Sequence, residues 1–572
     1  MPSLASSQTL RLHRGQKAVD ALLADMAKRD FVRRFLAKDA TLWKPDEDHA
    51  RVVKNRMGWL DVAGRMIDRA ADLKAFAAEV RDEGVRHVVL LGMGGSSLCP
   101  DVLRQTFRRK PGSPALMVLD TTDPDAIGAV DRAIDPARTL FIVSSKSGGT
   151  IEVQTLYAHF AESGTGASRS GPGRFVAITD QGTALEQMAR DAGFRRVFLN
   201  QPDIGGRYSA LSCFGMVPAA CLGIDIVRLL ERGDRMVRSL QPAHPIHDCP
   251  PVVLGAALGA LGLAGRDKVT FFASDAIATF GYWVEQLIAE STGKEGKGLV
   301  PVEGEPPGAP AVYGKDRLFV HLKLRTSPDA SIERRLSALR RAGHPTITVH
   351  LEDLHDLGGE FNRWEIATAV AGAALQIDPF DEPNVKESKD NTARVLDEYR
   401  ATRVLPGSPP DLEQEGVKAW TTVPLLPARR RRPLDPMRRL MGGWCGSVRK
   451  GDYVAIMAYM RMDPPTLARL GKLRLKLRAR CRAATTLGFG PRFLHSTGQL
   501  HKGGAGNGVF LQITCDKKND LGIPGEKYSF GVLQAAQAAG DFLSLSSRGY
   551  RVVRLHLGAS PLKDLDKVIA AV

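Results

Sequence analysis

The sequence has few cysteines, and none lies in a paired motif. Seven of the 572 residues are cysteine, at positions 99, 213, 221, 249, 445, 481 and 515. An odd number without a CxxC pair argues against a disulfide framework and against a zinc ribbon. We therefore expect free thiols in a reducing compartment, the cytoplasm.

The sequence also lacks a long hydrophobic run. The longest nearly uncharged apolar stretch, Val252 to Gly265, is interrupted by glycines and falls short of the ~20 residues of a membrane span. We interpret it as a buried helix and expect no membrane partner. Met1 to Ser6 shows no basic segment leading into an apolar one, so we expect no export. The composition, 43% hydrophobic and 25% charged, fits roughly two to four globular domains and excludes disordered, collagen-like and coiled-coil classes.

The positive charge is concentrated in one segment. The formal net charge is +16, and between Leu405 and Arg482 there are 17 Lys or Arg residues against 6 Asp or Glu. The segment contains Arg429 to Arg432 and an alternating run from Lys472 to Arg480. Such charge can neutralise nucleic-acid phosphates. Because no aromatic residues interleave with these two runs and no known nucleic-acid module surrounds them, we favour a solvated basic face over nucleic-acid binding.

Short β-branched runs alternate with helical patterns through most of the chain. This alternation predicts an α/β fold of doubly wound parallel sheets with helices on both faces. The expected strands are 87–91, 115–119, 139–143, 174–178 and 196–199 in a first block, and 268–272, 317–321 and 346–350 in a second.

The second block is loosely repeated near the C-terminus. Runs at 451–457, 508–514 and 549–556 echo its strands and predict a third, smaller α/β unit. Residues 472–481 alternate with a period of two, as a strand does, but the repeat places a helix there, and we favour the helix. The expected organisation is helical cover at 1–60, α/β units at 61–240 and 241–404, a basic Pro/Arg-rich linker at 405–450, and the C-terminal unit at 451–572.

Two polar loops follow strands of the first block. Gly92, Gly94 and Gly95 let backbone N–H groups approach an anion at the start of a helix. This loop alone also fits a dinucleotide fingerprint with Asp120 on the ribose, although Ser97 stands where the third glycine is needed.

The second loop, Ser144 to Glu152, combines four hydroxyls, one lysine and two glycines at a strand-to-helix junction. The alternative to phosphate binding is an N-capping turn whose hydroxyls satisfy helix amides. Two such loops after strands of one sheet favour a site for a terminal phosphate ester.

Three further motifs carry a resemblance to a family: Gly205-Gly-Arg207-Tyr-Ser209, Glu290-Ser-Thr-Gly-Lys294, and Asp378-Pro-Phe-Asp381 leading to Lys389. With the two loops, they make the chain similar to the glucose-6-phosphate isomerase (phosphoglucose isomerase) family, and most similar to the isomerase half of the bacterial bifunctional transaldolase/phosphoglucose isomerase. The likeness spans about 51–392 and 451–572. It implies tandem sugar-isomerase (SIS-type) domains and cofactor-free interconversion of glucose 6-phosphate and fructose 6-phosphate. No transaldolase barrel fits in the remaining residues, so the resemblance implies isomerisation alone.

The resemblance implies roles for particular residues. Glu290 is the proton-transfer base, Gln286 a positioning residue four positions earlier on the same helix face, and Arg207 the cation for the enediolate. The alternatives are an exposed Glu290–Lys294 helix pair and an arginine that closes a surface loop. The implied phosphate contacts are Gly95, Ser96, Ser145, Lys146, Ser147 and Thr150.

Ring opening requires an acid and a base, which the family provides with a histidine and a lysine. Lys389 holds the lysine position, with Lys386 as a rival, although Glu382 and Asn384 replace the usual Gln and Gly. No histidine lies at 300–318, where the family has its own.

The His-Ser-x-Gly-Gln context occurs only at His495 to Gln499. We expect the C-terminal unit to supply His495, either as a built-in partner or across a homodimer, with His501 as the fallback. The alternative is a loop histidine without a catalytic part.

We expect no metal and no cofactor, because the other histidines lack ligand spacing, and we expect Cys99 to be a small buried residue. Two rival functions remain: a non-catalytic phosphosugar-binding regulator, which would not need Glu290, Arg207 and Lys389 together, and a nucleotide-cofactor oxidoreductase.

Overall fold

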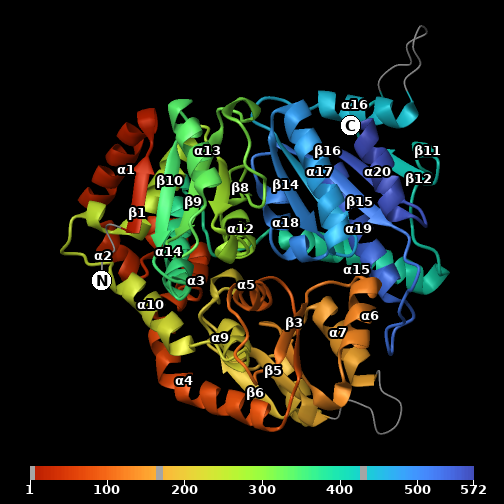
Figure 1. The fold of residues 1–572 in the computed structure, drawn as a ribbon, viewed down its shortest axis with the longest axis horizontal. Coiled ribbons are helices and arrows are strands. Elements are labelled where there is room, and N and C mark those ends of the chain that lie inside the picture. Colours follow the sequence, from red (N-terminus) through yellow and green to blue (C-terminus); the bar gives the residue numbers. More distant parts are fainter. Residues whose placement is uncertain (1–6, 163–171, 426–434) are drawn as a thin grey trace.

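The computed structural model describes residues 7–162, 172–425 and 435–572, which form three sheets with helices between and around them (Figure 1). The first sheet is parallel throughout, in the order β3-β2-β4-β5-β6. Its strands are β2 (His87–Gly92), β3 (Ala115–Leu119), β4 (Thr139–Ser144), β5 (Phe175–Asp180) and β6 (Arg196–Asn200). The strand order reverses between β2 and β4, and the two polar loops leave the sheet there, where open α/β sheets bind their ligands.

The helices of the first unit follow the predicted alternation. They are α4 (Trp59–Asp82), α5 (Leu98–Thr106), α6 (Pro124–Ala133), α7 (Ile151–Glu162), α8 (Ala184–Asp191), α9 (Cys213–Cys221) and α10 (Ile226–Arg238). The strands β2, β4 and β5 are almost wholly buried, as expected for β-branched runs covered on both faces.

The second sheet has the order β1-β10-β9-β7-β8, and only β1 runs antiparallel to its neighbour. Its strands are β1 (Gln8–Arg11), β7 (Lys268–Ala273), β8 (Val300–Val302), β9 (Arg317–Leu324) and β10 (Thr346–Leu351). Its helices are α11 (Pro250–Leu263), α12 (Phe280–Thr292), α13 (Ala330–Arg341) and α14 (Asp356–Leu375). The apolar stretch from Val252 is the buried helix α11, as predicted.

The N-terminal segment departs from the prediction of purely helical cover. It carries α1 (Gln16–Lys28), α2 (Phe31–Leu36) and α3 (Glu47–Lys54), but β1 adds an edge strand to the second sheet. Four residues that pair along an edge are too short a run to show a period in the sequence.

The third sheet has the order β11-β12-β16-β15-β13-β14. Its strands are β11 (Leu412–Gln414), β12 (Val417–Thr421), β13 (Tyr453–Tyr459), β14 (Ala484–Phe489), β15 (Gly508–Cys515) and β16 (Arg551–Leu557). Its helices are α16 (Pro436–Gly446), α17 (Pro464–Cys481), α18 (Gly498–Gly503), α19 (Phe530–Ser547) and α20 (Pro561–Ala571). The series β12-β16-β15-β13-β14 repeats the second sheet strand for strand, including the antiparallel first strand, and β11 adds one further strand beyond β12.

The segment 405–450 corrects the expectation of a linker. β11 and β12 pair with the third sheet, and α16 buries Leu440 and Trp444 in the core of the C-terminal unit. The run Arg429 to Arg432 lies outside the described residues.

The basic run within α17 is helical, as favoured over a strand, but it is only partly solvated. Arg474 and Arg478 are buried, and they donate hydrogen bonds to the main-chain oxygens of Glu303 and Pro306 in the second unit. A basic residue that satisfies buried carbonyls is held by packing and is not free to bind an external polyanion.

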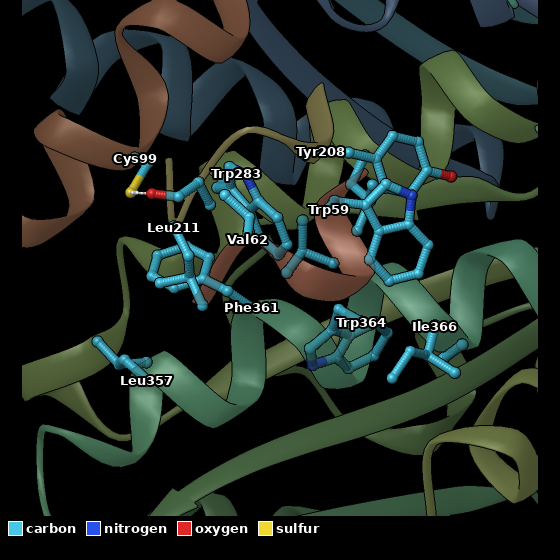
Figure 2. Packing of buried hydrophobic residues seen from close by; sticks show 14 of the residues in the cluster. Trp59, Val62, Cys99, Tyr208, Leu211, Trp283, Leu357, Phe361, Trp364 and Ile366 are labelled. Atoms are coloured by element: carbon cyan, nitrogen blue, oxygen red, sulfur yellow. Dashed lines mark hydrogen bonds between the residues drawn. The ribbon is translucent and has the colours of Figure 1, made fainter. Parts of the chain in front are cut away.

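A buried aromatic cluster lies where the first two units meet (Figure 2). Trp59 stacks on Tyr208 with ring centroids 5.3 Å apart, and Trp283 meets Phe361 edge to face at 4.7 Å. Cys99 is buried here and donates to the Ala210 main-chain oxygen at 3.3 Å, which is the structural role expected for it. This packing fixes the short helix η8 (Gly206–Tyr208), which carries Arg207.

Among the residues that the structure describes, no helix combines the length and the apolar character needed to cross a bilayer.

Candidate active site

The first polar loop lies directly against the turn that carries Arg207. A β-carbon at Gly95 would stand 1.9 Å from the main-chain oxygen of Gly206, so only glycine fits this approach of two backbones. Gly94 has φ +54°, and a β-carbon there would stand 2.8 Å from Gln286 Nε2. The glycines therefore bring the loop after β2 into contact with both η8 and α12.

Glu290 lies on α12 with its carboxylate almost enclosed. One oxygen, Oε2, accepts a hydrogen bond from Gln286 Nε2 at 3.1 Å, and the other lies 3.4 Å from Arg207 Nη1. Burial raises the pKa of Glu290, Arg207 opposes this, and the carboxylate of Glu382 raises the pKa further. A carboxylate of raised basicity beside a fixed cation is suited to taking a proton from carbon.

Arg207 is buried and held by hydrogen-bond acceptors around its guanidinium. Its Nε donates to Ser291 Oγ at 2.7 Å, and its Nη2 donates to the main-chain oxygens of Pro379 and Asp381, each at 2.7 Å. Nη1 donates to Glu382 Oε2 at 3.0 Å. Although burial lowers the pKa of Arg207, the carboxylates of Glu290 and Glu382 raise it overall, so the guanidinium stays charged.

The residues of the two loops differ in their exposure and contacts. Ser96 and Ser145 are buried, and Ser145 Oγ lies 3.3 Å from Thr150 Oγ1 while it accepts from Gly148 N at 3.1 Å. Ser147 is exposed. Lys146 donates to the Asp180 carboxylate and, at 3.0 Å, to the Pro202 oxygen. Hydroxyls and amides thus line the loops, whereas the lysine is already paired.

His495 reaches this region from the C-terminal unit. It ends the short helix η12 (Arg492–His495), and its main-chain oxygen accepts from Gln286 Nε2 at 2.7 Å. Its Nε2 lies 3.0 Å from Glu152 Oε1, a buried carboxylate on α7 directly after the second loop. Burial raises the pKa of Glu152, but the charge and hydrogen bond of His495 lower it overall. The two form a carboxylate–imidazole pair that can move a proton between oxygens.

Gln499 ties the same loop of the C-terminal unit to the second unit. Its Nε2 donates to the Gly293 oxygen at 2.9 Å and to Asn384 Oδ1 at 2.8 Å, while its Oε1 accepts from Asn384 N at 2.8 Å. A β-carbon at Gly293 would stand 2.4 Å from Leu500 Cα, so α18 packs directly on the glycine of the Glu-Ser-Thr-Gly-Lys motif. His495 is therefore positioned through contacts within one chain.

Lys389 lies on α15 (Val385–Thr402), which packs against α19. Its side chain is exposed, and its charge lowers the pKa of Glu152, so it acts on the carboxylate that binds His495. The rival Lys386 donates to Asp390 on the helix surface at 2.9 Å. The fallback histidine, His501, is buried against the rings of Phe493 and Phe510, and burial lowers its pKa to about 3.

The sequence assigned no role to three residues of this region: Glu152, Ser291 and Glu382. Glu152 and Ser291 stood inside the quoted motifs, but nothing in their spacing distinguished them from neighbouring polar residues. Glu382 stands where the family usually has glutamine, and the structure shows that it forms an ion pair with Arg207.

Asp120 does not have the free carboxylate that ribose recognition requires. It is buried, accepts from Ser97 Oγ at 3.2 Å and lies 3.1 Å from Arg492 Nε. These contacts join the first unit to the C-terminal unit and weigh against the dinucleotide interpretation of the first loop.

Comparisons with known proteins identify the family of the chain. The family model for phosphoglucose isomerase matches residues 61–303. The chain is 31% identical over 367 residues to the glucose-6-phosphate isomerase of Rubrobacter xylanophilus, which covers 55% of this chain and 83% of that protein. It is 27% identical over 343 residues to the probable glucose-6-phosphate isomerase of Haloarcula marismortui, which covers 54% of this chain and 78% of that protein.

Solved structures give the same fold. A hypothetical protein of Thermus thermophilus superposes with a TM-score of 0.56 at 24% identity, over 68% of this chain and 99% of that one. A glucose-6-phosphate isomerase of Chlamydia trachomatis superposes with a TM-score of 0.52 at 18% identity, over 66% of this chain and 86% of that one.

Proposed function

The chain belongs to the phosphoglucose isomerase family, and we propose that it interconverts glucose 6-phosphate and fructose 6-phosphate with Glu290 as the proton-transfer base. As a member of this family it is an aldose–ketose isomerase. The observation that carries the assignment is the position of the Glu290 carboxylate, buried between Gln286 and Arg207 and beside the first hydroxyl-rich loop.

The reaction moves one proton between adjacent carbons. Glu290 takes the proton from C2 of the open-chain aldose, and the C–H electrons form the C1=C2 bond while charge develops on oxygen. Arg207 is fixed by four hydrogen bonds in a buried position, so it can stabilise that charge without reorganising. The hydroxyl proton on O2 passes to O1, the carbonyl forms at C2, and return of the carbon-bound proton to C1 gives the ketose. The same carboxylate serves both carbons.

The phosphate is proposed to bind at the loops after β2 and β4. Gly95 and Ser96 from the first loop and Ser145, Ser147 and Thr150 from the second offer amides and hydroxyls at the reversal of strand order. Lys146 is included with the substrate contacts, but its ammonium already pairs with Asp180, so we do not propose it as the main phosphate donor.

Ring opening is assigned to His495, oriented by Glu152, together with Lys389. The C-terminal unit takes the place of a partner subunit, since Gln286 and Glu152 both bind His495 within one chain. The proposed reaction needs no cofactor, because side chains alone transfer the proton. The seven free cysteines support a cytoplasmic location.

The test is a coupled assay that follows glucose 6-phosphate formed from fructose 6-phosphate. We expect Glu290→Gln to lose ~10²–10⁴ in rate while sorbitol 6-phosphate, which has no carbonyl to isomerise, still binds. Glu295→Gln is the matched control, because Glu295 pairs with Lys44 at the surface and should leave the rate unchanged. Retention of most of the turnover by Glu290→Gln would refute the assignment. Binding of sugar phosphate by the unmodified chain without any turnover would favour the regulator.

A further inference from the structure

Three potential metal ligands meet beside the loop that supports Arg207. His49 lies on α3, and Asp378 and Asp381 lie between α14 and α15. One ligand atom from each lies within 4.8 Å of the others, and His49 Nε2 is 3.8 Å from Asp381 Oδ2. Two donors that are each about 2.1 Å from a shared ion stand roughly 3–4 Å apart, so His49 and Asp381 already have the spacing for one cation.

His49 is oriented as metal-binding histidines are. Asp46 caps α3, accepting from His49 N at 3.1 Å, and its Oδ1 lies 2.7 Å from His49 Nδ1. A carboxylate on Nδ1 holds the ring in the tautomer whose Nε2 lone pair is free. That free nitrogen faces Asp381.

Asp378 provides an independent sign of a missing partner. The residue is fully buried, and its Oδ2 has no hydrogen-bond partner among the described residues. An unpaired buried carboxylate oxygen costs free energy unless a cation or donor meets it.

The local charge is also unbalanced. Within the described part of the chain, Lys294 is the one ammonium in direct contact with the group, donating to the main-chain oxygen and Oδ1 of Asp381. Against it stand the side chains of Asp46, Asp378 and Asp381, so one ammonium faces three acidic side chains. Lys294 occupies Oδ1 of Asp381 and leaves Oδ2 towards His49.

The two segments are held in register by packing. Phe380, which lies between the two aspartates, meets Trp43 edge to face with ring centroids 5.1 Å apart and lies 5.4 Å from the ring of Tyr208. The backbone that carries the two aspartates is therefore held against the N-terminal segment, as a specific site requires.

We propose that His49, Asp378 and Asp381 bind a divalent transition-metal ion that joins the N-terminal segment to the loop 378–382. One nitrogen and two carboxylate oxygens suit Zn²⁺ or Mn²⁺ better than Mg²⁺, which prefers oxygen ligands. The ion is structural: the loop it holds presents the Pro379 and Asp381 oxygens to Arg207. The site lies outside the isomerase chemistry and does not depend on it.

The test is calorimetric titration of the metal-stripped full chain with ZnCl₂, MnCl₂ and MgCl₂, with thermal melting in parallel. We expect one equivalent of Zn²⁺ or Mn²⁺ to bind and to raise the melting temperature. His49→Gln and Asp378→Asn should each weaken binding by at least about tenfold. Asp48→Asn is the matched control, because this exposed carboxylate on the same helix pairs with Arg51 at the surface.

Two results would overturn the proposal. One is the absence of any saturable transition-metal binding by the unmodified chain. The other is a His49→Gln variant that binds the metal as tightly as Asp48→Asn does. Because the side chain of His49 is partly exposed, this substitution should leave the fold intact. Neither result bears on Glu290, since the titration requires no turnover.

Discussion

Arg207 joins two carboxylates of different character. Glu290 is nearly enclosed, with a side chain 12% exposed, whereas the side chain of Glu382 is 43% exposed. Nη1 of the arginine lies 3.4 Å from the first and 3.0 Å from the second. Because Glu382 makes the shorter contact with Arg207, it offsets part of the positive charge that would otherwise lower the pKa of Glu290.

Removal of the Glu382 charge should therefore change the pH dependence of the reaction. Glu290 faces Arg207, Lys294, Gln286 and Glu382, and of these Glu382 raises its pKa together with burial, while the others lower it. In Glu382→Gln the pKa of Glu290 falls, so the acidic limb of kcat/KM, where the base loses its proton-accepting form, moves to lower pH. We expect kcat at the optimum to stay within about tenfold, since a weaker base is compensated by a larger ionised fraction.

The matched control for Glu382→Gln is Glu387→Gln. Glu387 pairs with Arg548 at the end of α19, and neither residue is among the contacts of Arg207 described above. Its pH profile should overlay that of the unmodified chain. An acidic limb that stays in place in Glu382→Gln, or moves to higher pH, would show that Glu382 does not tune the base.

Side chains on one helix could be placed from the sequence, whereas pairs between distant segments could not. Gln286 and Glu290 are four positions apart, so a helix puts them on one face, and the structure shows the hydrogen bond at 3.1 Å. Glu152 and His495 are 343 positions apart, and Lys146 finds Asp180 at the end of β5. No local period encodes such pairs, because the packing of whole units brings them together.

At the scale of elements, the loop after β2 can approach η8 closely only because Gly95 has no side chain. The loop after β2 touches η8 through Gly95 and the carbonyl of Gly206. We predict that Gly95→Ala displaces the Arg207 turn, because neither backbone can yield ~1 Å without breaking its own contacts. A misplacement of this size costs about 10²-fold in kcat.

The control for this prediction is Gly206→Ala, on the other side of the same contact. A β-carbon at Gly206 meets nothing within 4 Å, so the change adds the same methyl group without a clash. We expect kcat close to that of the unmodified chain when both variants are measured in the coupled assay. Equal rates in Gly95→Ala and the unmodified chain would contradict the need for this approach.

The elements that the sequence failed to predict share a physical reason. β11 and β12 are three and five residues long and only partly buried, so their apolar pattern is weak. α16 contains Gly442 and Gly443, which lower helix propensity, and tertiary packing of Trp444 and its neighbours overrides that preference. The fully buried strands β4, β5 and β13 were predicted because packing on both faces demands uninterrupted apolar runs.

At the scale of the whole molecule, the C-terminal unit repeats the second unit and faces it. The two sheets share one strand order and one antiparallel edge, and α18 packs on α12 while β14 lies against β8 (Figure 1). The sequence echo predicted an additional α/β unit, but the antiparallel strand β12, which corresponds to β1, could not be predicted because it lay in the expected linker. Under the proposed function, the duplicated unit takes the place of a second subunit of a symmetric dimer.

This arrangement predicts how the site responds when two inactive variants are mixed. Glu290→Gln and His495→Ala should each lose ~10²–10⁴ in rate, since each removes a proton-transfer group. If both groups serve one site within a chain, an equimolar mixture is no more active than the average of the two variants measured separately. If His495 instead crossed between subunits, mixed dimers would contain an intact pair and activity would return. We expect no recovery, even after the two variants are refolded together, because Gln286 and Glu152 hold His495 through contacts inside a single chain.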